Sequence, residues 1–315
     1  MSLSLPTLVR PYRDYDLRRM ALDSRVTYTR STDMTYFGPD GLMHIAPPNV
    51  APLEYDPVTG LVLGRSFWEE RTNVIKNSSN LTEPGWGNVN CTITTNDALA
   101  PDGTVTAAKV AATTAAGARI HYGYNQEPFR STFVFTSSVY LKAGTYSHAR
   151  LSSSYAMNAN HSITINLLTG EYTSRAGSDA VFGVKPVGDG WYRVGLSRTN
   201  NTYQFNCFAL YLTSYASSSD VGGSASGYYP DAGQYIHVWQ PQWEAGVGAS
   251  PLIPTAGAAV TRAETVASFA VPPGVVRFVT TYADSTETTQ AVTPGATYTI
   301  PHGTKAIRHI RGYKS

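Results

Sequence analysis

The chain has 315 residues and a formal net charge of +2, and only 15% of its residues are charged. That share is well below the roughly 25% typical of globular proteins, whereas Tyr, Thr, Ser, Gly and Asn are abundant, which favours strands and turns over helices. Such a small net charge does not indicate a nucleic-acid or acidic-membrane partner. Nowhere do about twenty apolar residues follow one another, and the first residues form no apolar segment, so we expect neither a membrane span nor a signal peptide.

The first part of the chain is predicted to be extended. Residues 1–24 mix Pro, Arg, Asp and Tyr without an alternating pattern and are interpreted as an N-terminal arm that docks on another subunit or a neighbouring protein. In residues 25–84, short strand candidates alternate with turns such as Gly38-Pro39-Asp40-Gly41. We expect this lead-in segment to wrap a larger body.

Residues 85–252 alternate apolar and polar side chains in many short segments separated by Gly, Asn, Ser and Pro. This spacing predicts an all-β fold, an antiparallel jelly-roll or lectin-like sandwich. The predicted core consists of the apolar members of these segments: Phe133, Phe135, Val139, Ile163, Ile165, Tyr192, Val194, Leu196 and Phe208. Cys91 and Cys207 lie in strand-like contexts and could be bridged, although synthesis in a reducing cytoplasm favours two buried thiols.

Residues 253–315 contain four further strand candidates separated by Pro-Gly turns, which predicts a small C-terminal β-domain. About sixty residues are marginally stable alone. Together with the docking arm, this predicts a homo-oligomer, most simply a trimer.

Several separated motifs occur in a fixed order between about residues 26 and 264. They are Tyr28-Thr29-Arg30-Ser31-Thr32, Tyr55-Asp56-Pro57-Val58-Thr59-Gly60, Glu69-Glu70-Arg71-Thr72-Asn73, Ala100-Pro101-Asp102-Gly103-Thr104, Gly190-Trp191-Tyr192-Arg193-Val194 and Gln242-Trp243-Glu244-Ala245-Gly246, followed by Ile253-Pro254-Thr255 and Thr261-Arg262-Ala263. In this order they resemble bacteriophage head-fibre and tail-fibre proteins that carry a carbohydrate-binding-module-like jelly roll.

The resemblance implies a virion protein, assembled in the bacterial cytoplasm, that contacts other virion proteins and is often trimeric. It brings no agreed set of binding residues. The long shaft and the enzymatic inserts of many fibres are absent from this sequence, so a compact decoration or adaptor protein remains an alternative to a free fibre.

No motif of a hydrolase, a nucleotide-binding protein or a zinc protein occurs in the sequence. Glu69 and Glu70 are adjacent, and adjacent strand residues point to opposite faces, whereas a glycosidase needs two carboxyls facing each other about 5–10 Å apart. We therefore expect pairing of these glutamates with Arg71, no catalytic residue, no metal site and no cofactor. Jelly-roll lectin modules often hold one structural calcium ion through dispersed carbonyl groups, and such a site has no sequence motif.

Aromatic side chains are the one feature with a predicted recognition role, because sugar rings stack on exposed aromatic faces. The candidate glycan-binding residues are Tyr122, Tyr124, Tyr228, Tyr229, Tyr235, His237 and Trp239. A strand buried on both faces, or a subunit interface, explains most of them equally well. Tyr228 and Tyr229 lie in a Ser- and Gly-rich loop and fit a core less easily.

Three functions follow from these observations. The first is a non-enzymatic virion protein that presents its jelly roll to assembly partners or host glycans. The second is a glycan depolymerase of the phage tail, which requires two carboxylates converging in a groove. The third is a decoration protein without a ligand.

Overall fold

The protein is all-β, as the sequence predicts. The computed structural model describes residues 10–113, 117–123, 134–154, 161–175, 180–199, 206–213 and 230–314, and this part of the chain contains strands and turns without a helix. No helix that could cross a membrane occurs within these ranges.

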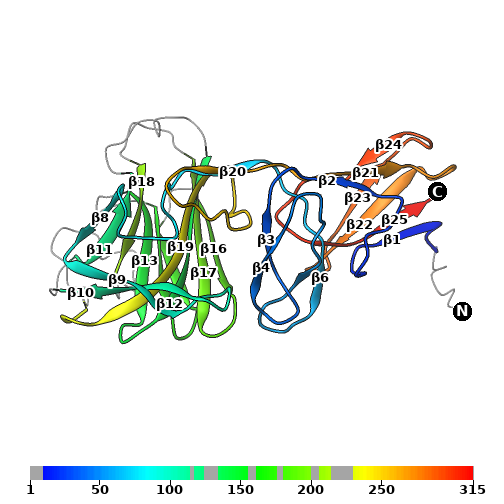
Figure 1. Ribbon diagram of the computed structural model, residues 1–315. Helices are drawn as coiled ribbons and strands as arrows, with labels where there is room; N and C mark the ends of the chain where they lie inside the picture. The colour runs from blue at the N-terminus through cyan, green and yellow to red at the C-terminus, as the bar shows by residue number, and fades with distance from the viewer. Residues whose placement is uncertain are drawn as a thin grey trace, which may run out of the picture.

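Two six-stranded antiparallel sheets form a sandwich at one side of the molecule (Figure 1). The first has the order β16-β17-β12-β19-β10-β9, with bounds Ala180–Pro186, Trp191–Thr199, Val134–Ala143, Tyr235–Ala245, Val105–Ala112 and Cys91–Leu99. The second has the order β15-β14-β13-β18-β11-β8, with bounds Tyr172–Arg175, Ser162–Asn166, His148–Ser154, Asn206–Tyr211, Arg119–Tyr122 and Trp86–Val89. The predicted antiparallel jelly-roll sandwich is confirmed.

The main hydrophobic core lies between these sheets, because alternate residues of each strand point inward. Of the predicted core, the fully buried members are Val139, Ile163, Ile165, Val194, Leu196 and Phe208. Phe135 and Tyr192 are partly buried and pack against this cluster. Phe133 lies outside the described residues. Cys91 and Cys207 are both free and buried, so of the two alternatives for the cysteines the buried thiols are the one observed.

The C-terminal unit is built from both ends of the chain. Its larger sheet has the order β1-β25-β22-β23, with bounds Arg13–Asp16, Ile307–Tyr313, Arg277–Tyr282 and Glu287–Ala291. A smaller sheet joins β2 (Thr27–Thr29), β21 (Val266–Ala270) and β24 (Thr297–Thr299). Tyr15 is 1% exposed, and its ring stacks on Phe269 with centroids 4.1 Å apart.

This arrangement corrects the interpretation of the arm. Residues 13–16 pair with β25 of their own chain rather than with another subunit, and Leu17 is buried in the same core. The alternation that buries Tyr15 and Leu17 was hidden among charged neighbours, which face the surface of the sheet.

The lead-in segment lies between the sandwich and the C-terminal unit (Figure 1). It contains the pairs β3–β4 and β5–β6 and the strand β7, with bounds Met34–Phe37, Met43–Ala46, Glu54–Tyr55, Val62–Gly64 and Arg71–Asn73. Strand β7 pairs with β20 (Val260–Arg262) from the C-terminal part of the chain. Met43 and Phe37 belong to a cluster that packs on the outer face of the sandwich beside Tyr140 and Trp239. The lead-in therefore covers part of the sandwich.

Buried arginines hold the loops of the lead-in. The guanidinium of Arg30, 1% exposed, donates hydrogen bonds to the carbonyl oxygens of Thr32, Ala46, Pro47 and Val50 at 2.7–3.1 Å. Burial of a charged group is tolerated where its donors are satisfied, and a planar guanidinium serves several carbonyls at once.

Candidate functional site

Two of the predicted glycan-contacting rings are buried. Tyr122 is 3% exposed, its hydroxyl accepts a hydrogen bond from the backbone N–H of Lys76 at 3.0 Å, and its ring packs against Trp86. Trp239 is 5% exposed and donates its Nε1–H to Oγ1 of Thr106 at 3.1 Å. Neither residue offers a ring face to a sugar, so both are corrected from candidate ligand contacts to packing residues.

Tyr235 and His237 are partly exposed on the outer face of β19. Their ring centroids lie 5.2 Å apart, and Nζ of Lys109 lies 4.6 Å from the centroid of the Tyr235 ring. Nε2 of His237 lies 3.1 Å from Oδ2 of Asp97. These two residues remain predicted glycan contacts. Tyr124, Tyr228 and Tyr229 lie outside the described residues.

The acidic residues of the sequence motifs have structural roles. Glu69 pairs with Arg71, with Oε2 and Nη2 3.3 Å apart, as expected. Glu244 is fully buried and accepts hydrogen bonds from the backbone N–H and the hydroxyl of Ser250 at 2.9 and 2.6 Å. The buried carboxylate of Glu244 thus stabilises the turn at Ser250, whereas Glu69 is an exposed residue that pairs with Arg71.

Sequence reasoning missed a cavity of about 580 Å³ at the junction of the sandwich, the lead-in segment and the C-terminal unit. Ligand sites typically occupy roughly 300–1,000 Å³ and favour such junctions. Its floor is formed by small residues that face each other across β16, β17 and β12. Gly183 is opposite Gly195, and Ser197 is opposite Thr136. Because these side chains are short or absent, the sheet surface is hollowed there.

Aromatic side chains from several segments line the same cavity. They are Tyr36, Phe37, Tyr55, Trp68 and Tyr140. Three lining residues, Glu54, Trp68 and Arg193, each keep one buried polar atom without a hydrogen-bond partner: Oε1, Nε1 and Nε, respectively. An unsatisfied buried polar group costs about 1–3 kcal/mol, so a polar ligand that reaches these groups would recover part of that cost.

The pKa values of the carboxyl groups that line the cavity are shifted in different directions. Burial of Glu54 raises its pKa above the ordinary carboxyl value, against a hydrogen bond with Ser66. Burial also opposes ionisation of Asp56, but its carboxylate accepts hydrogen bonds from the N–H groups of Thr59 and Val58, and its pKa is lowered overall. Oδ2 of Asp284 pairs with Nζ of Lys305 at 2.6 Å, and that hydrogen bond lowers the pKa of Asp284. The pKa of Glu54 is thus shifted upward, whereas the pKa values of Asp56 and Asp284 are shifted downward.

No metal site is evident at this junction. Within the described ranges, no three His, Cys, Asp or Glu side chains gather closely enough to hold an ion.

No protein-family model and no curated protein sequence matches the chain. Among solved structures, it is similar to the enzymatically active domain of tailspike protein 4 of bacteriophage CBA120, with 14% identity and a TM-score of 0.31 over 55% of this chain and 21% of that one. It is also similar to the CBM22-1 xylan-binding domain of Paenibacillus barcinonensis Xyn10C, with 12% identity and a TM-score of 0.30 over 56% of this chain and 94% of that one.

A third similar structure contains the CBM22-1 and GH10 modules of a Clostridium thermocellum xylanase in complex with xylohexaose. Its identity is 13% and its TM-score 0.31, over 59% of this chain and 30% of that one. The chain thus spans less than a third of the tailspike and xylanase structures that it matches.

Proposed function

We propose that the protein is a non-enzymatic structural and recognition component of a bacteriophage particle, and that it binds a glycan in the cavity between its sandwich, lead-in and C-terminal unit. The virion part of the proposal rests on the order of the sequence motifs. The glycan part rests on one observation, a cavity of about 580 Å³ that combines aromatic walls with unsatisfied polar groups. Sugars present apolar C–H faces and a ring of hydroxyls, and both kinds of surface find partners there.

A blocking variant tests the site. An added Cβ at Gly183 meets no atom within 4 Å, so Gly183→Val fits the backbone and places its side chain in the cavity. We expect this variant to lose binding on an array of bacterial surface glycans while it keeps the unfolding midpoint of the unchanged protein. Ser174→Val, which adds bulk on the exposed edge strand β15, is the control and should bind normally. If Gly183→Val binds glycans as well as the unchanged protein does, the glycan does not bind in this cavity.

The depolymerase alternative has one observation in its favour. Glu54 and Asp56 line the same cavity, and their pKa values are shifted in opposite directions, a pattern shared with acid and base pairs of glycosidases. Against it, the carboxylate of Asp56 is held by two N–H groups of its own turn.

Release of new reducing ends from host capsular or lipopolysaccharide glycans decides between the two functions. We expect none over several hours. Release that disappears in Glu54→Gln would establish the depolymerase instead. A protein that binds no glycan but is incorporated into particles would be a decoration protein, and its position in the intact particle can be seen by cryo-electron microscopy.

A further inference from the structure

Two cations face each other directly on the outer surface of the sandwich. Lys185 of β16 is the register partner of Arg193 of β17, and both line the cavity. The Cβ atoms of such directly opposed residues lie about 4.5–5.5 Å apart, and like charges in these positions destabilise a sheet unless an anion lies between them.

No carboxylate of the described residues forms an ion pair with either cation, although the charge of Lys185 acts to lower the pKa of both Glu54 and Asp56. Arg193 donates through Nη2 to the carbonyl oxygen of Ser250 at 2.6 Å and to the hydroxyl of Ser138 at 3.2 Å, and its guanidinium lies 5.3 Å from the ring centroid of Tyr140. Its Nε–H has no acceptor.

The other described charged residues of the cavity also leave Lys185 and Arg193 without an ion-pair partner. The lining cations are Lys185, Arg193 and Lys305, and the lining acids are Glu54, Asp56 and Asp284. Lys305 and Asp284 neutralise each other, and Asp56 is bonded within its own turn. None of the three lining acids forms an ion pair with Lys185 or Arg193, so a carboxylate from a ligand can bind between these two cations.

From this geometry we propose that the cavity binds an acidic saccharide, with the sugar carboxylate between Lys185 and Arg193 and the sugar ring against the aromatic wall. This inference rests on the proposed glycan-binding function and names the class of its ligand. A guanidinium and a carboxylate form strong charge-assisted hydrogen bonds, and the Nε–H of Arg193 is a donor still free to take part.

Matched pairs of probes test the inference by isothermal titration calorimetry. The acidic probes are 3′-sialyllactose and a galacturonic acid trisaccharide; the neutral probes are lactose and the carboxyl-reduced form of the trisaccharide. We expect the protein to bind at least one acidic probe about tenfold or more tightly than its neutral counterpart, since a hydrogen bond to a charged group contributes about 1.5–3 kcal/mol. The preference should weaken as salt is added.

Lys185→Ala is the decisive variant because its side chain is exposed and no packing is lost. We expect it to lose most of the preference for the acidic probe over its neutral counterpart. Lys76→Ala, an exposed residue outside the cavity that removes the same charge, should keep the preference.

Each other outcome contradicts a different statement. Equal affinity for the acidic and neutral probes overturns the acidic-sugar inference and leaves the proposed function standing. Equal losses in Lys185→Ala and Lys76→Ala show that the general field of the protein, rather than this pair, attracts the acid, which also overturns it. If the protein binds none of the four probes and no glycan on the array, the proposed function itself is overturned.

Discussion

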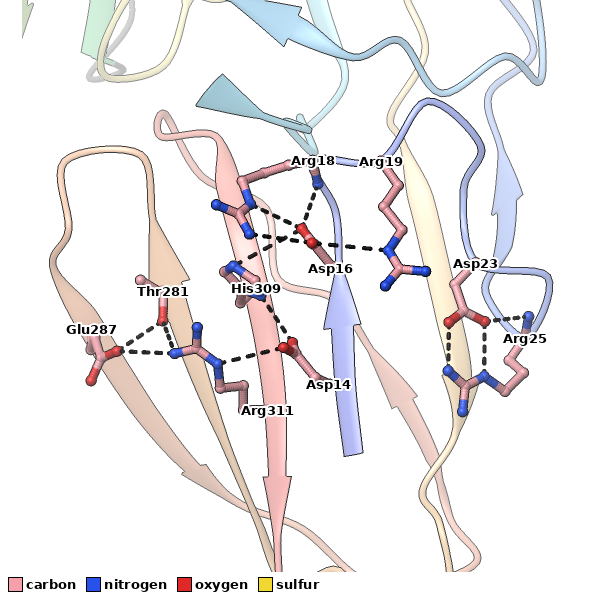
Figure 2. A network of polar contacts seen from close by, with 10 residues as sticks. All are labelled: Asp14, Asp16, Arg18, Arg19, Asp23, Arg25, Thr281, Glu287, His309 and Arg311. Atoms are coloured by element: carbon pink, nitrogen blue, oxygen red, sulfur yellow. Dashed lines mark hydrogen bonds and ion pairs between the residues drawn. The ribbon is translucent and has the colours of Figure 1, made fainter. Parts of the chain in front are cut away.

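Nδ1 of His309 lies 2.9 Å from Oδ1 of Asp14, although 295 positions separate the two residues. Arg311 extends the contact, with its Nε 3.8 Å from the other oxygen of Asp14 and its Nη1 3.9 Å from Glu287 (Figure 2). The first described strand and the last strand of the protein are thereby joined by polar contacts above a shared core.

The apolar core beneath these polar contacts should contribute more to the free energy of unfolding than the polar contacts do. Tyr15→Ala removes a ring buried among Phe269 and Phe278, and we expect it to destabilise the C-terminal unit by about 3–5 kcal/mol, as aromatic truncations in cores do. Hydrogen exchange should speed up in β22 and β25 and stay unchanged in the sandwich. Unchanged protection of β25 would show that β1 does not complete this sheet.

Asp14→Ala should cost much less, about 1 kcal/mol, because the aspartate side chain is 40% exposed and solvent screens its charge. Urea unfolding measures the difference. Glu70→Ala, at an exposed position in the lead-in, is the control and should leave the midpoint unchanged. If Asp14→Ala lost as much stability as Tyr15→Ala, the core would not be the larger contributor to the stability of this unit.

Arg30→Lys should destabilise the lead-in by about 2 kcal/mol or more. An ammonium group cannot replace a guanidinium that serves four backbone carbonyls, and each lost hydrogen bond to a charged donor costs about 1.5–3 kcal/mol. Differential scanning calorimetry should show the loss. Arg277→Lys, on a partly exposed strand position, serves as the control. Equal stability of the two variants would mean that the carbonyls are satisfied in other ways.

The sandwich could be predicted from the sequence because its signal is local. Residues such as Val139, Ile163 and Val194 alternate with polar neighbours, and burial on one face of a strand requires that pattern. The pairing of β1 with β25 could not be predicted, because no local pattern specifies a partner almost three hundred residues away.

The cavity was missed for the same reason, with one exception. Glu54, Trp68 and Arg193 come from segments that only the folded chain brings together. The opposition of Lys185 and Arg193, however, follows from the hairpin turn at Gly188-Asp189-Gly190, since both residues stand four positions from Asp189. Counting outward from that turn would have placed two cations side by side.

The trimer predicted from the sequence is supported by a different feature of the structure than the N-terminal arm. Residues 13–17 of the arm pack within their own chain, but the lead-in segment exposes Ile45, Val58 and Leu61 at 61%, 56% and 64%. We propose that a neighbouring subunit covers these three side chains in a trimer. Light scattering should give three times the 34.0 kDa of one chain. A monodisperse monomer, with both termini resistant to protease, would remove the proposal.

Both thiols should be inert in the folded protein. Burial raises the pKa of Cys207 to about 12 and also raises that of Cys91. Since the thiolate is the reactive form, Ellman's reagent at pH 8 should label neither cysteine in the native protein and both after unfolding in guanidinium. Rapid native labelling that disappears in Cys207→Ala would show that the outer face of β18 opens readily.

Acid should weaken the turn before β2 in a defined window. A hydrogen bond from Arg25, with its Nε 2.8 Å from Oδ1 of Asp23, lowers the pKa of Asp23 from 3.8 to about 2. Because the folded-state pKa is the lower one, the stabilisation is fully present above about pH 4 and is lost as the pH falls toward 2. We expect Asp23→Asn to be less stable than the unchanged protein in urea at pH 7, and the gap to close between pH 4 and pH 2. Asp231→Asn, at an exposed aspartate, should show no such closing gap. A difference that persists at pH 2 would mean that Asp23 acts through the geometry of its turn rather than through its charge.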